Sequence, residues 1–191
     1  MVRNMAKSVT PGYVVVYPNR DKAASKLTKL TVVLLLLLSI GLMLLITVGG
    51  WSKLQGLKAL DILWCLIYLV LAFYVGARWS RGALTMAAAL GVLLLIIAVI
   101  AATGIASTSW FDRNSFGFAA SKTLFGGKGL GSDVLGTLTA LLIPVQALLI
   151  AVATVAFSQS WNIETEVPES EAKNRGRRRP PSSSSAEPAA A

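Results

Sequence analysis

Two acidic residues, Asp61 and Asp133, are the side chains best placed to do chemistry, because each stands at the start of a long apolar run. If the two helix starts were neighbours, the carboxylates could bind a cation or a proton. Alternatively, each carboxylate could cap its helix, accepting hydrogen bonds from free backbone N–H groups and meeting the positive end of the helix dipole. The sequence favours capping and leaves the paired site as the alternative.

The most polar point inside an apolar run is formed by Pro144 and Gln146. A glutamine in hydrocarbon needs a hydrogen-bond partner, and a proline removes one backbone hydrogen bond and often kinks a helix. The two residues therefore predict a helix–helix hydrogen bond beside a kink. The functional alternative is a hinge or a polar point along a substrate path.

The residues that the chain lacks exclude most other chemistry. There is no histidine, the commonest metal ligand and general base, and the single cysteine, Cys65, cannot form an internal disulfide or a CxxC pair. The glycine run Gly126–Gly131 lacks the spacing of a phosphate loop and predicts a flexible joint instead. We expect no catalytic residue, no cofactor and no metal site, and hence a protein that is not an enzyme.

Four apolar runs must position these residues. Of the 191 residues, 54% are hydrophobic and only 14% are charged, against about 25% charged in a soluble domain. A helix of about 20 apolar residues spans the hydrocarbon core of a bilayer. The sequence therefore predicts an all-α integral membrane protein, a four-transmembrane-helix bundle over residues 30–157 with helices at 30–48, 62–77, 83–106 and 134–157.

The segments around the bundle are polar. Residues 1–29 form a basic arm, in which the β-prone stretch 12–18 is either a strand that docks on a partner or an ordered arm on the membrane surface. The aromatic loop 107–133 predicts an interfacial or re-entrant segment, and the tail 158–191 is predicted to be disordered. The basic cluster of the tail either is solvated or binds anionic lipid headgroups; it comprises Arg175, Arg177, Arg178 and Arg179.

The net charge of +9 arises from basic residues that flank the apolar runs, which favours the lipid bilayer over nucleic acid as the partner. With the amino terminus inside, 13 of the 18 lysines and arginines lie on the cytoplasmic side. The positive-inside rule therefore predicts a multi-pass protein of the cell (plasma or inner) membrane with both termini in the cytoplasm.

Small residues share one face on each of two predicted helices, and this spacing lets helix backbones approach closely in lipid. We expect the helices at 83–106 and 134–157 to pack through these faces, so that Ala98→Leu or Ala147→Leu disrupts the fold or its assembly. The faces comprise Ala87, Gly91, Ala98 and Ala102 on the first helix, and Gly136, Ala140, Pro144, Ala147 and Ala151 on the second.

These observations favour a non-catalytic membrane protein that serves as an accessory, scaffold or assembly subunit, partnered by other membrane subunits or by further copies of itself. The alternative is a subunit of an oligomeric small-solute or ion transporter or channel, with Asp61, Asp133 and Gln146 as its candidate residues. A third hypothesis is an enzyme acting on lipid headgroups, which would use Asp61, Asp112 or Asp133 with Arg113 and Lys122 holding phosphate.

Overall fold

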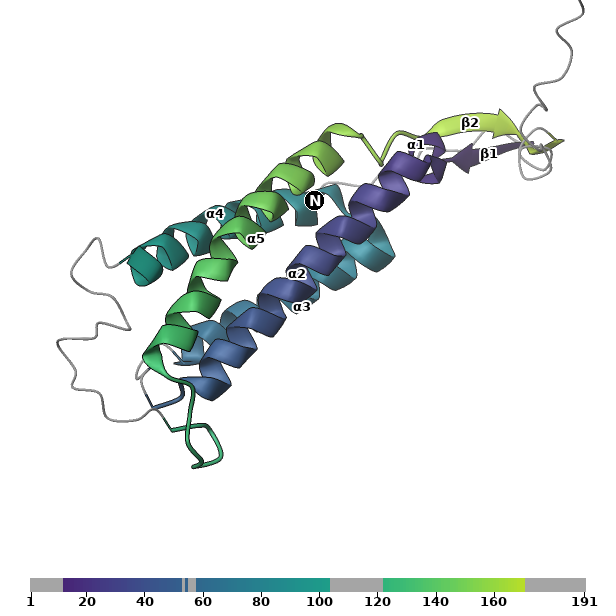
Figure 1. The fold of residues 1–191 in the computed structure, drawn as a ribbon. Helices are drawn as coiled ribbons and strands as arrows, with labels where there is room; N and C mark the ends of the chain where they lie inside the picture. The colour runs from purple at the N-terminus through teal and green to yellow at the C-terminus, as the bar shows by residue number, and fades with distance from the viewer. Residues whose placement is uncertain (1–11, 53, 55–57, 104–121, 171–191) are drawn as a thin grey trace, which may run out of the picture. The chain divides into compact units, whose positions relative to one another are not determined.

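The computed structural model describes residues 12–52, 54, 58–103 and 122–170. Four long helices dominate this part of the chain: α2 (Ala23–Gly49), α3 (Lys58–Arg78), α4 (Arg81–Thr103) and α5 (Ser132–Ser158) (Figure 1). The shortest, α3, has 21 residues and is therefore about 32 Å long, enough to cross a hydrocarbon core of about 30 Å. The predicted all-α, four-transmembrane-helix fold is confirmed.

The helices extend beyond the apolar runs that predicted them. The helix α2 begins at Ala23 rather than at residue 30, because alanine, lysine and leucine in this stretch favour helix even outside the apolar segment. The connection between α3 and α4 consists of Trp79 and Ser80 alone. The Ser80 hydroxyl accepts a hydrogen bond from the Ala83 N–H at 3.3 Å, and so caps the start of α4.

The four helices form a bundle in which α2 packs against α3 and α5, and α4 packs against α5 and, less extensively, α3. We call the end that holds Trp79 and Trp161 the tryptophan end; α2 and α4 begin there, and α3 and α5 finish there. At the opposite end, residues 122–130 form a hairpin between α4 and α5, and we call this the hairpin end.

The bundle has apolar side chains on its outside and several polar ones inside. Large exposed residues such as Leu34, Leu66 and Leu148 lie along the outer faces of the helices, whereas Ser39 and Gln146 are fully buried. In water such an outer surface would be an extensive exposed hydrophobic patch, but in a bilayer it faces lipid tails. The distribution therefore agrees with a multi-pass membrane protein.

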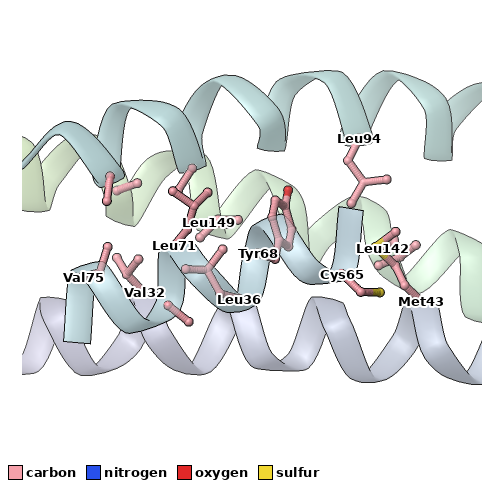
Figure 2. Close-up of a cluster of buried hydrophobic side chains, with 14 of the residues drawn as sticks. Val32, Leu36, Met43, Cys65, Tyr68, Leu71, Val75, Leu94, Leu142 and Leu149 are labelled. Atoms are coloured by element: carbon pink, nitrogen blue, oxygen red, sulfur yellow. The ribbon is translucent and has the colours of Figure 1, made fainter. Parts of the chain in front are cut away.

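Buried apolar side chains fill the space between the helices on both sides of Tyr68. Figure 2 shows Leu36, Leu71 and Leu149 on the side of the tryptophan end, and Cys65, Met43, Leu142 and Leu94 on the side of the hairpin end. Cys65 is thus a buried hydrophobe, as its position inside an apolar run predicted.

Residues near the two ends of the chain form a separate unit. Strand β1 (Tyr13–Val16) pairs antiparallel with β2 (Thr165–Pro168), with Val14 opposite Val167. The short helix α1 (Pro18–Asp21) follows β1, and from Asn19 onward it belongs to the unit that contains the bundle. The Tyr17 hydroxyl also donates a hydrogen bond of 3.1 Å to the Glu164 carboxylate. The β-prone stretch 12–18 therefore finds its strand partner in the same chain.

This pairing corrects the prediction that the tail is disordered from residue 158. Residues 158–170 are ordered, because a β-branched strand in the arm provides backbone partners for residues 165–168 and covers Val167. Residues 171–191, with the arginine cluster Arg175, Arg177, Arg178 and Arg179, lie outside the described residues, as do the aromatic residues of segment 104–121.

The glycine run, whose composition predicted a flexible joint, forms the turn of the hairpin and the segment that leads into α5. Within the hairpin, the Thr123 N–H donates to Gly127 O at 2.9 Å, and Gly126 adopts a φ of +85° that favours glycine at this turn. The hairpin is fastened to the end of α2, because Leu130 N–H donates to Gly49 O at 2.9 Å and Leu124 N–H donates to Val48 O at 3.3 Å.

Candidate functional site: a central polar layer and a cavity at the hairpin end

Gln146 on α5 lies at the centre of a layer of polar side chains that joins three helices. Its amide nitrogen donates to the Ser39 hydroxyl on α2 at 2.8 Å, and its carbonyl oxygen accepts from the Tyr68 hydroxyl on α3 at 3.0 Å. The Ser39 hydroxyl in turn donates to Leu35 O at 2.7 Å. All three side chains are fully buried, so these bonds meet the predicted need of Gln146 for a helix–helix partner.

The fourth helix contacts the same layer through a glycine. A Cβ atom on Gly91 of α4 would lie 3.1 Å from the Ile150 side chain and 3.6 Å from Gln146 Oε1, so the absence of a side chain lets α4 approach α5 closely. Pro144 lies on the exposed side of α5, which continues through it without interruption from Ser132 to Ser158. We refer to Ser39, Tyr68 and Gln146 as the central polar layer.

Asp61 is half-buried near the hairpin end. Its carboxylate accepts a hydrogen bond of 3.3 Å from the Thr47 hydroxyl on α2, which shares its single proton with Met43 O at 2.8 Å. Asp61 is the fourth residue of α3, so it lies in the first turn rather than at the N-cap predicted for it. Its carboxylate still interacts favourably with the positive end of the α3 dipole. Instead of capping the start of α3, it forms a hydrogen bond that connects α3 to α2.

A cavity of about 30 Å³ lies beside Asp61 and is lined by all four helices. Most of its walls are apolar, and the polar lining residues are Asp61, Trp64 and Thr139. The Trp64 ring also meets Tyr68 edge to face, with ring centroids 6.4 Å apart, so the cavity adjoins the central polar layer.

Asp133 does not share this site. It is an exposed residue in the first turn of α5, and the N-cap of that helix is Gly131. Asp133 is therefore not the N-cap residue that was predicted, although it does lie at the positive end of the helix dipole. Asp61 lines the cavity, whereas Asp133 does not. Of the two carboxylates that the sequence offered as a pair, the cavity therefore includes only Asp61.

The small-residue faces have different environments on the two helices. On α4, Ala87, Gly91 and Ala98 are buried against neighbouring helices and Ala102 is half-buried, in agreement with the prediction. On α5 the prediction is wrong, because the face that packs inward carries larger side chains such as Leu142 and Leu149 with Gln146. The residues of the predicted small-residue face on α5 point outward, with Gly136 half-buried and Ala140, Ala147 and Ala151 exposed.

The tryptophan end contains a cluster that the sequence did not single out. Trp161 is fully buried against Trp79, with ring centroids 5.1 Å apart and ring planes at 81°. The Lys29 ammonium lies 4.0 Å from the centre of the Trp79 ring and donates to Gly76 O, near the carbonyl end of α3. Arg20 donates from Nε to Trp161 O at 3.1 Å. Cations and aromatic rings thus close this end of the bundle.

Two of the layer residues could have been found from the sequence. Ser39 and Tyr68 stand near the midpoints of their apolar runs, as Gln146 does in its own, so helices of similar length place all three at similar depth. No protein-family model matches this sequence, and no curated protein or solved structure gives a significant match. The functional interpretation therefore rests on the geometry of these residues.

Proposed function

We propose that this chain is a non-catalytic multi-pass membrane protein that serves as an accessory, scaffold or assembly subunit of a membrane complex. The central polar layer is the observation that carries the proposal. Ser39, Tyr68 and Gln146 direct their polar groups at one another across three helices, which is the arrangement of residues that hold a bundle together. Polar groups near mid-membrane that bind a ligand would instead face an opening.

The outer face of α5 supports an assembly role. Ala140, Ala147 and Ala151 recur at helical spacing on the exposed side of this helix. Small residues in that pattern let the backbone of another transmembrane helix come close, whether from a different subunit or from a second copy of this chain. The cavity is an observation that supports the alternative, a transporter subunit. Against it, apolar side chains such as Leu36, Leu71 and Leu149 fill the bundle towards the tryptophan end.

Substituting Ala147 tests the assembly role. We expect Ala147→Leu to remove the associated species from the protein purified in a mild detergent, because the larger side chain keeps a second helix away. The free energy of unfolding of the single chain should change by less than about 0.5 kcal/mol, as for other surface positions. Analytical ultracentrifugation and unfolding in mixed micelles measure the two effects.

The matched control is Ala87→Leu, which makes the same change at a fully buried position of α4. Overpacking should lower the free energy of unfolding by about 2 kcal/mol. The assembly role would be abandoned if the wild-type chain purified as a lone monomer at every concentration and brought no other protein with it.

We further propose that the tryptophan end faces the cytoplasm of a cell that carries the protein in its plasma or inner membrane. Within the described part of the bundle, this end holds one acidic residue, Asp21, and several basic ones, which are Arg20, Lys22, Lys26, Lys29, Arg78 and Arg81. Such an excess of positive charge is typical of the cytoplasmic side.

Cysteine labelling of intact cells tests this orientation. In a Cys65→Ser background, Lys128→Cys should react with a membrane-impermeant thiol reagent, because Lys128 is exposed in the hairpin. A cysteine at Lys22, near the start of α2, should react only after the membrane is permeabilised. The opposite labelling pattern would reverse the proposed orientation.

A further inference from the structure

The cavity at the hairpin end has the size and lining of a site for water. Its volume of about 30 Å³ accommodates one or two water molecules, since one water needs about 10–15 Å³ measured in this way. A buried water also needs two to four polar partners, and Asp61, Trp64 and Thr139 provide three. The remaining walls are apolar and come from Met43, Ile46, Leu60, Leu94, Ile97, Ala98, Ala101 and Leu142.

Trp64 provides a hydrogen-bond donor that the protein itself does not satisfy. Its indole nitrogen is buried and has no hydrogen-bond partner among the described residues. Tyr68 is a neighbour whose hydroxyl donates its proton to Gln146. Its oxygen is an acceptor, but the Trp64 indole N–H does not meet it with the geometry of a hydrogen bond. An unsatisfied buried donor costs about 1–3 kcal/mol, so an acceptor at this position would stabilise the fold.

Asp61 and Thr139 provide the complementary acceptors. An ionised carboxylate can accept about four hydrogen bonds, and the bond from Thr47 occupies one of these positions. The Thr139 hydroxyl donates its proton to Leu135 O at 2.9 Å, which leaves the lone pairs of its oxygen able to accept. Residues that carry an unused donor and unused acceptors therefore line the same small cavity. A molecule that both accepts and donates hydrogen bonds can connect them.

We propose that this cavity is a water-binding site, in which water accepts a hydrogen bond from Trp64 and donates hydrogen bonds to Asp61 and Thr139. Asp61 is half-buried near the end of the bundle, so water reaches the cavity past its carboxylate. The site hydrates Asp61, while the central polar layer beyond Trp64 stays dry. The proposal does not depend on the assembly role.

Solution NMR of the full chain, labelled with ¹⁵N-tryptophan in detergent micelles, tests the site. The indole N–H of Trp64 should show a cross-peak to water. The indole N–H of Trp161 is the internal control, because it is donated to Gln159 Oε1 at 3.0 Å and its side chain is fully buried. Trp64→Phe and Trp161→Phe assign the two signals. A Trp64 signal with no water cross-peak, like that of Trp161, would overturn the proposal.

Two further variants locate the water. Ala98→Val adds two methyl groups at the cavity wall and should abolish the Trp64 cross-peak, while the other indole signals stay in place as evidence of an intact fold. Asp61→Leu should shift the Trp64 signal, whereas Asp133→Leu should leave it unchanged because Asp133 is outside the cavity. If Tyr68→Phe shifts the Trp64 signal and Asp61→Leu does not, the indole bonds directly to Tyr68, and the water site is wrong.

Discussion

Replacing Trp161 by alanine should lower the free energy of unfolding by about 4 kcal/mol, within the range for removing a buried aromatic side chain. Trp161 is fully buried and packs edge to face on Trp79, so the substitution leaves a large void where α2, α5 and the α3–α4 connection meet. It also removes the N–H donor that bonds to Gln159 Oε1. Unfolding by sodium dodecyl sulfate in mixed micelles, followed by circular dichroism, measures the loss.

Trp51→Ala is the control for this prediction. Trp51 is half-buried, and the Lys58 ammonium lies 4.7 Å from the centre of its ring. Trp51→Ala should lower the free energy of unfolding by about 1 kcal/mol or less, the size of an exposed cation–π interaction. Equal losses for the two tryptophans would show that the Trp79–Trp161 pair does not hold the tryptophan end together.

Replacing Gln146 by alanine should lower the free energy of unfolding by about 3 kcal/mol. The change removes two interhelical hydrogen bonds, worth about 1–2 kcal/mol in total, and opens a void near the middle of the bundle. Gln146→Met keeps most of the side-chain volume, so it should lower the free energy of unfolding only by the contribution of the two hydrogen bonds. The same unfolding experiment measures both variants.

A double-mutant cycle separates the hydrogen bond from the packing. Tyr68→Phe removes the hydroxyl that donates to Gln146, so in a Gln146→Met background it should have a smaller effect than in the wild type. Additive effects, or a Gln146→Met variant as stable as the wild type, would show that the central polar layer contributes no binding energy between the helices.

The four spans were predictable because length and composition alone decide whether a segment can cross a bilayer. The face of α5 that packs inward was not predictable from length and composition. Helical periodicity shows that Ala140, Ala147 and Ala151 share one face, but it does not show whether that face points towards lipid or towards other helices. Both environments are apolar, so hydrophobic contrast does not distinguish the two faces of a helix as it does in a soluble protein.

The candidate site was predictable only in part. The need of Gln146 for a partner followed from burying an amide in hydrocarbon, but the choice of Ser39 and Tyr68 depends on how the helices rotate in the bundle. Capping was assigned to Asp61 and Asp133 because the apolar runs begin there. Both helices begin before these residues, since helix propensity extends past the apolar segment.

The pairing of β1 with β2 restricts how the chain can be threaded through a bilayer. The two strands lie 148 residues apart in the chain on either side of the four long helices, and their backbones bond residue by residue from Tyr13 with Pro168 to Val16 with Thr165. Two strands can pair only if they lie on the same side of the membrane. An odd number of membrane crossings between β1 and β2 is therefore incompatible with this sheet. The sheet also forms late in synthesis, because β2 follows α5 in the chain, and its closure requires that all four long helices have been oriented consistently.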